Sequence, residues 1–144
     1  MTDSQFHTFR SLEIETGWSF SNTQHSPLEN WYEKNRDTPI ENLTDGDLAR
    51  CCRQDQYLDY IMPICIERLE KSPSSGEMCA YELLFSMNSI HQEYWRKNTD
   101  SAKMILRIIS SLNHDELNEL FRDEIEALIY SLEKALRATD KIMR

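Results

Sequence analysis

Histidine and cysteine are the side chains best suited to metal binding and to acid-base or nucleophilic chemistry, and the sequence has four of each. The histidines are His7, His25, His91 and His114. They are far apart, and none belongs to a His-x-x-x-His or Glu-x-x-His pair; a Cys-x-x-Cys pair is also missing. The spacing therefore predicts neither a metal site nor a bound cofactor.

His91 is the histidine that most resembles an acid-base group, because it lies near Glu93 and Tyr94. A catalytic base needs charged neighbours that shift its pKa toward the working pH, and the sequence around His91 does not reveal them. We therefore interpret His91 as a partly exposed histidine on a helix.

Acidic pairs such as Asp45 with Asp47, or Asp123 with Glu124, resemble the paired carboxylates of hydrolases, but such pairs are also common on exposed helix ends. The three glycines cannot supply a phosphate-binding loop, a dinucleotide fingerprint or a nucleophile elbow. We predict that the protein is not an enzyme, with a small enzyme of unrecognised type as the remaining alternative.

Surface charge is the chemistry that remains, since the net charge is −9 with 25 acids against 16 bases. Phosphate groups need a basic surface, so direct binding to nucleic acid is not expected, and a basic protein is the better partner. Solubility alone can also explain an acidic surface. A first acidic set comprises Glu41, Asp45, Asp47, Asp55 and Asp59. A second acidic set comprises Asp115, Glu116, Glu119, Asp123, Glu124 and Glu126.

The elements that carry these acids are predicted to be helices. Few glycines and prolines, with many Leu, Ile, Met and Glu residues, favour long helices over a sheet with many turns. A chain of 144 residues fits a single domain, 1–144, with residues 1–25 mostly irregular. We predict an all-α, single-domain compact bundle of about six helices with a long C-terminal helix.

Capping signals locate the predicted helix starts in the first half of the chain. Ser26, followed by Pro27 and Glu29, is a strong start. Thr44 and Asp47 have the spacing of a capping box. Around that second start, Leu43 and Leu48 can form a hydrophobic staple, and Asp45-Gly46 belongs to the first turn.

Later signals are mixed. Asp55 is expected to cap a helix that Pro63 either kinks, as we favour, or restarts. Apolar residues recur along this helix at three- and four-residue steps and predict one buried stripe: Leu58, Ile61, Met62, Cys65, Ile66 and Leu69. Ser74 and Glu77 predict another capped helix, with Met78, Tyr81, Leu84 and Phe85 on its apolar face and a pattern continuing toward Tyr94 and Trp95. A further helix is expected from about Ser101, with an apolar stripe of Met104, Ile105, Ile108, Ile109 and Leu112.

The last helix is predicted to run without a break from His114, with Asn113 and Glu116 as its cap pair. An apolar seam that includes Leu128, Leu132 and Leu136 follows it. We expect this seam to pack within the same domain, with a coiled coil between two chains as the alternative.

The cysteines indicate a reducing compartment. Adjacent Cys51 and Cys52 rarely bridge, and Cys65 and Cys79 are expected to be small buried groups, so all four are predicted to be free thiols. The amino terminus does not read as a signal peptide, and apolar segments fall short of the ~20 residues that span a bilayer. A cytoplasmic protein without membrane insertion is expected.

A pattern of dispersed residues resembles a known family. The carboxyl-terminal part of this pattern consists of Pro39-Ile40, Leu43-Thr44, Asp47-Leu48, Gln54, Leu58, Tyr60-Ile61, Pro63, Leu69, Pro73, Gly76-Glu77 and Glu82-Leu83-Leu84. Ser11-Leu12-Glu13 and Gly17-Trp18 extend it toward the amino terminus. Together these residues resemble the immunity proteins of bacterial contact-dependent growth inhibition systems.

The resemblance implies a protein that binds the C-terminal domain of its cognate toxin, a domain that is commonly a nuclease, and blocks it without doing chemistry. A basic nuclease cleft attracts an acidic inhibitor. The expected toxin-binding residues are therefore Asp45, Asp47, Asp115, Glu116, Glu119 and Asp123. Trp31, Tyr94 or Trp95 can serve as apolar anchors, although aromatic residues at helical spacing more often belong to the core. The alternative is a helical adaptor or a protein that homodimerises through its last helix, so a monomer or a weak homodimer is expected.

Overall fold

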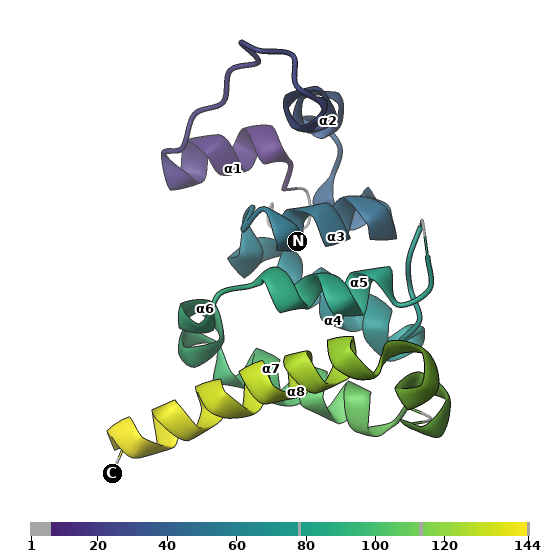
Figure 1. Cartoon of the computed structure of the whole chain (residues 1–144). Helices are drawn as coiled ribbons and strands as arrows, with labels where there is room; N and C mark the ends of the chain where they lie inside the picture. Colours follow the sequence, from purple (N-terminus) through teal and green to yellow (C-terminus); the bar gives the residue numbers. More distant parts are fainter. Residues whose placement is uncertain (1–6, 78, 113, 144) are drawn as a thin grey trace. The chain divides into compact units, whose positions relative to one another are not determined.

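The computed structural model describes residues 7–77, 79–112 and 114–143, and within the last helix it leaves out the side chains of residues 114, 116–118, 120 and 138–143. The described residues form eight α-helices, two short 3₁₀ helices and no strand (Figure 1). The all-α prediction is confirmed, with more helices than the six or so that were predicted. The chain divides into two compact units, residues 1–44 and 45–144, which are described separately.

The first unit contains α1 (Phe9–Thr16), α2 (Pro27–Asn35) and the 3₁₀ helix η2 (Ile40–Asn42). The sequence predicted the start of α2 correctly: Ser26 is its N-cap, its side chain accepts from the Glu29 amide, and Pro27 is the first helical residue. Helix α1 begins with a second capping box, between Thr8 and Ser11. Residues 7–25 thus hold one short helix in otherwise irregular chain.

Aromatic rings build the core of the first unit. The Tyr32 ring stacks on Phe9 with centroids 4.7 Å apart, and the rings of Trp18 and Phe20 also contact Tyr32. Phe9 and Tyr32 are buried, whereas Trp18 remains 45% exposed. The unit therefore keeps part of its aromatic cluster at the surface.

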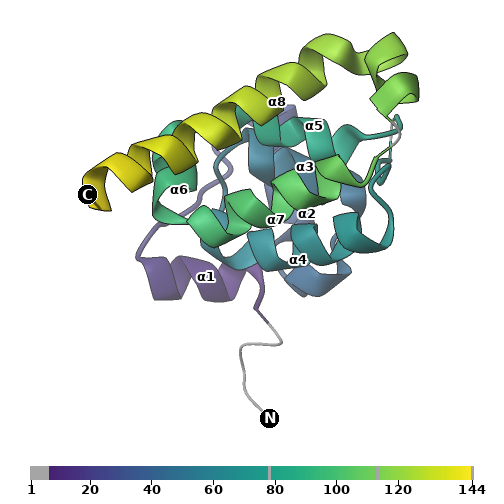
Figure 2. The ribbon, with the colours of Figure 1, turned by 90° about the horizontal axis from the view of Figure 1, so that it is seen from below.

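The second unit consists of the remaining helices. They are α3 (Asp45–Arg53), α4 (Leu58–Lys71), α5 (Glu82–Ser86), η3 (Met87–Ser89), α6 (Gln92–Lys97), α7 (Thr99–Ser110) and α8 (His114–Met143). Helix α5 lies between α3 and α8 in Figure 1 and packs against both. Helix α8 runs across α6 and α7, and α7 also packs against α4 (Figure 2).

The predicted start after Thr44 is confirmed, since α3 begins at Asp45. Leu43 and Leu48, on either side of this start, are both buried. The predicted role of Asp55 is wrong. Asp55 has a left-handed backbone, with φ 53°, and the Gln56 amide donates to the Cys51 carbonyl, so Asp55 ends α3 in a Schellman turn. Tyr57, rather than Asp55, precedes α4.

Helix α4 contains Pro63 and still extends from Leu58 to Lys71, so the helix does not restart at this proline. Its six buried side chains belong to the apolar stripe read from the sequence: Leu58, Ile61, Met62, Cys65, Ile66 and Leu69. Helix α4 continues through Pro63 because burial of these apolar side chains contributes more free energy than the missing amide hydrogen bond of the proline costs.

The helix predicted from Ser74 is wrong. Turns occupy this segment instead: the Ser75 amide donates to Ser72, and the Tyr81 amide donates to Ser74. The Glu77 amide is bound by the Glu82 carboxylate, which removes Glu77 from a capping role. Met78 lies outside the described residues.

The pattern from Leu84 toward Trp95 is also not one helix. Helix α5 ends at Ser86, η3 follows, and extended backbone at Ile90 and His91 separates them from α6. Gln92 then donates to the Ser131 carbonyl on α8, which holds the start of α6 against that helix.

The terminal helix is bent rather than continuous, because Phe121 has non-helical φ and ψ of −137° and 32°. The Phe121 ring contacts Tyr81 and Phe85, so the bend is held against α5. Leu128 and Leu132 are fully buried, which confirms that the seam packs within the chain. The proposed cap pair, Asn113 with Glu116, lies outside the described residues and side chains.

In the part of the chain that the structure describes, no helix combines the length and the hydropathy needed to cross a membrane.

Candidate functional site

The residues first considered for metal or acid-base chemistry are dispersed. Within the described part of the chain, no three His, Cys, Asp or Glu side chains are grouped to hold a metal ion. His91 is half exposed, and its Nε2 atom lies 3.9 Å from an oxygen of Asp55, another exposed side chain. This pair has ionic character only when the histidine is protonated.

The four cysteines are free thiols, as predicted. Cys51, Cys52 and Cys65 are buried, and a hydrogen bond with Cys52 together with burial raises the pKa of Cys65 well above its usual value. Burial also raises the pKa of Cys51. These three are packing groups of the core. Cys79 was expected to be buried as well but is exposed, because its segment forms turns instead of a packed helix.

The two candidate acids of the first acidic set occupy the first turn of α3. Asp45 Oδ1 lies 3.1 Å from Arg68 Nη1 on α4, and both side chains are largely buried, at 30% and 24% exposure. Asp47 is half-buried. Acids in a first helical turn are also stabilised by the amide dipoles. Asp45 therefore has a structural role in joining α3 to α4.

The second acidic set lies on both sides of the bend in α8. Asp115 and Glu119 are exposed before Phe121, and Asp123 is exposed after it; the side chain of Glu116 lies outside those described. Arg122, the base in this stretch, is 3.8 Å from Glu126. Asp123 forms no ion pair with another residue that the structure describes. This stretch presents carboxylates with little local compensation.

The candidate acids of the two sets lie on different helices: Asp45 and Asp47 are on α3, and the second acidic set is on α8. Helix α5 and η3 pack against both α3 and α8, and therefore lie between the helices that carry the candidate residues (Figure 1). The six predicted residues do not share one element. The α8 acids are the more exposed group, and the α3 acids are the more engaged one.

Two of the three aromatic anchors suggested by the sequence are unavailable. Trp95 is fully buried and Tyr94 nearly so, whereas Trp31 is half-buried. The sequence did not single out Tyr130, which is 60% exposed on α8 with Lys134 Nζ 5.9 Å from its ring centre. The buried Leu128 and Leu132 are each two residues from Tyr130, so the helical period places Tyr130 on the opposite, exposed face of α8.

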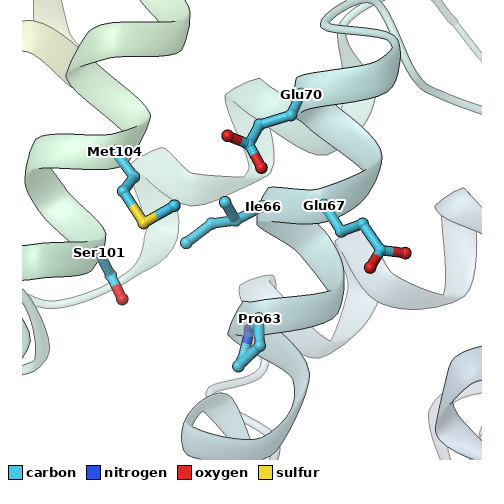
Figure 3. Close-up of a pocket in the computed structure, with 6 residues that line it drawn as sticks. All are labelled: Pro63, Ile66, Glu67, Glu70, Ser101 and Met104. Atoms are coloured by element: carbon cyan, nitrogen blue, oxygen red, sulfur yellow. The ribbon is translucent and has the colours of Figure 1, made fainter.

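A groove between α4 and α7 was also missed. It has a volume of about 340 Å³, and its lining residues are Pro63, Ile66, Glu67, Glu70, Ser101 and Met104 (Figure 3). Ile66 and Met104 belong to apolar stripes that the sequence revealed, but the groove exists only because α4 and α7 pack together. The residue pattern of a single helix does not show which other helix packs against it.

Comparison with known proteins gives a family. No curated protein matches the chain. A family model described as CDI immunity proteins, where CDI is contact-dependent growth inhibition, matches residues 13–105. The match includes α2 through α6 and most of α7, and it stops before the acidic start of α8. Because this match covers more than half of the 144 residues, the chain belongs to the CDI immunity protein family.

Proposed function

We propose that this protein binds the C-terminal domain of its cognate contact-dependent growth inhibition toxin and neutralises it by tight, non-catalytic binding. The family match over residues 13–105 carries the proposal. Immunity proteins of this kind typically act without catalysis, and a single-domain, cytoplasmic, monomeric inhibitor fits that role. The burial of Leu128 and Leu132 within the chain gives no support to dimerisation through the α8 seam.

The proposed toxin is a basic nuclease. A nuclease needs positive charge to hold phosphate, and a protein with a net charge of −9 is attracted to that charge and repels nucleic acid. The exposed Asp115, Glu119 and Asp123 on α8 are the proposed contact acids, with Glu116 between them in sequence. Asp45 and Asp47 form a second, less favoured contact surface for the toxin, because Asp45 already pairs with Arg68.

The test is coexpression with the toxin domain encoded immediately upstream of the gene. The proposal predicts that the two proteins copurify as a complex and that cells expressing both survive. A pair that neither associates nor relieves toxicity would refute it.

The nuclease part is tested separately, with the purified toxin domain and labelled DNA and RNA. We expect cleavage by the toxin domain alone and no cleavage after addition of this protein. A toxin domain that is neutralised in cells but cleaves neither substrate would leave the immunity function standing and exclude the nuclease.

A further inference from the structure

We propose that the α4–α7 groove receives a lysine or arginine side chain of the toxin as an anchor. This inference rests on the proposed function, because it takes the toxin domain as the partner. None of the six predicted acids lines this groove.

The groove has an apolar floor. Ile66 is nearly buried on α4, Met104 is half-buried on α7, and the Met104 side chain points toward Ile66 (Figure 3). Long basic side chains lay their methylene groups along such apolar surface while the charged end stays near water. The floor therefore fits the stem of a lysine or an arginine.

Two carboxylates stand at the rim. Glu67 and Glu70 are both exposed and are three residues apart on α4, within one helical turn. In Figure 3 the Glu70 carboxylate lies on the side of the groove that faces Met104, whereas Glu67 points away from it. Glu70 is accordingly the first partner of an incoming cation, and Glu67 adds negative potential.

The chain itself neutralises this rim only weakly. Glu67 Oε1 is 3.7 Å from Lys71 Nζ, but both side chains are exposed, and exposed pairs of this type contribute little. Glu70 forms no ion pair within the described part of the chain. The lining contains no basic side chain, so charge complementarity selects a cation rather than an anion or a purely apolar group.

The experiment measures binding of the full chain to the purified toxin domain by calorimetry, with Glu70→Gln, Glu67→Gln and Met104→Ala variants. Glu133→Gln is the matched control, since Glu133 is an exposed acid on α8. We expect Glu70→Gln to weaken binding about tenfold, Glu67→Gln to weaken it less, and Glu133→Gln to leave it unchanged. Met104→Ala should also weaken binding, through loss of the apolar floor.

A second arm identifies the cation. Each exposed lysine and arginine of the toxin domain is changed to alanine and combined with Glu70→Gln in a double-mutant cycle. One basic residue should lose most of its effect on affinity when Glu70 is already neutral. Because Glu70 and Glu67 are exposed, their variants keep the fold, and circular dichroism verifies this for every variant.

The outcomes separate the two proposals. Wild-type protein that does not bind the toxin domain would overturn both. Wild-type protein that binds tightly, with Glu70→Gln and Glu67→Gln indistinguishable from Glu133→Gln, would overturn the groove while the immunity function stands.

Discussion

At the scale of single residues, one carboxylate joins the two helices of the first unit. Glu13 on α1 is 9% exposed and receives hydrogen bonds at 2.6 and 2.8 Å from Arg36, which follows α2. The Tyr32 hydroxyl donates a third at 2.9 Å. These donors favour the ionised form, and the hydrogen bonds from Arg36 are the largest reason why the pKa of Glu13 is lowered from its usual 4.5.

This lowered pKa predicts an acid-dependent contribution to stability. Below pH 4.5 the unfolded chain takes up a proton at Glu13 before the folded chain does, so falling pH favours unfolding. The contribution is fully present above pH 4.5 and is lost as the pH falls through the folded pKa. Glu13→Gln should lower the free energy of unfolding at pH 7 by about 1–3 kcal/mol. Below pH 4.5 its stability should depend less on pH than that of the wild type.

Urea unfolding followed by tryptophan fluorescence, repeated between pH 7 and pH 2, measures both effects. Trp18 and Trp31 report on the first unit. The wild-type and Glu13→Gln curves should approach each other at the acid end, where both side chains are neutral. Parallel curves across the whole range would contradict the prediction.

At the scale of elements, helix starts depend on a few capping atoms. The Ser26 hydroxyl accepts from the Glu29 amide at 3.1 Å, and the Glu29 carboxylate accepts from the Ser26 amide at 3.2 Å. Ser26→Ala removes the first of these bonds and should destabilise the chain by about 1 kcal/mol. Ser19→Ala, at an exposed loop position in the same unit, is the control. Equal urea midpoints for the two variants would show that the cap contributes nothing.

The end of α3 provides a test of backbone strain. Asp55 adopts φ 53°, which glycine tolerates better than any residue with a Cβ atom. Asp55→Gly and Asp55→Ala both lose the carboxylate near His91 and differ from each other only by the Cβ methyl group. The glycine variant should be more stable than the alanine variant by about 1 kcal/mol in urea unfolding. Equal stability would mean that this turn does not require a left-handed residue.

The sequence was a good guide to elements wherever a local signal decides the structure. Ser26-Pro27 and Thr44 marked true helix starts, and the stripe of α4 was buried as predicted. The sequence was a poor guide where contacts between residues far apart in the chain decide the structure. The bend at Phe121 is held by rings on and beside α5, and the start of α6 is held by α8. Neither contact leaves a pattern in the nearby residues.

At the scale of the whole molecule, the sequence revealed the charge and the family but not the surfaces. Net charge is a sum over residues, so the value of −9 follows from the sequence without a structure. Exposure and pairing do need one: Asp45 is committed to Arg68, Trp95 is buried, and Glu70 lies at a groove made by two helices. A list of acidic residues therefore names candidates for toxin binding without ranking them.

The ranking proposed for the acidic sets predicts association kinetics. Reversing the second acidic set at Asp115, Glu116 and Glu119 to lysine removes negative potential from the start of α8, where the described acids are exposed. We expect the association rate with a basic toxin domain to fall about tenfold or more at low salt. The remaining rate should depend less on ionic strength, because long-range attraction between exposed charges is what salt screens.

Stopped-flow measurements over a range of salt concentrations test this, with a control triple that changes the net charge equally. The control lysines replace exposed acids outside both acidic sets: Glu33, Asp100 and Glu133. If steering depends on where the charge lies, the α8 triple slows association much more than the control. Equal slowing would mean that only net charge matters, and unchanged kinetics in the α8 triple would move the contact to Asp45 and Asp47 or to an uncharged interface.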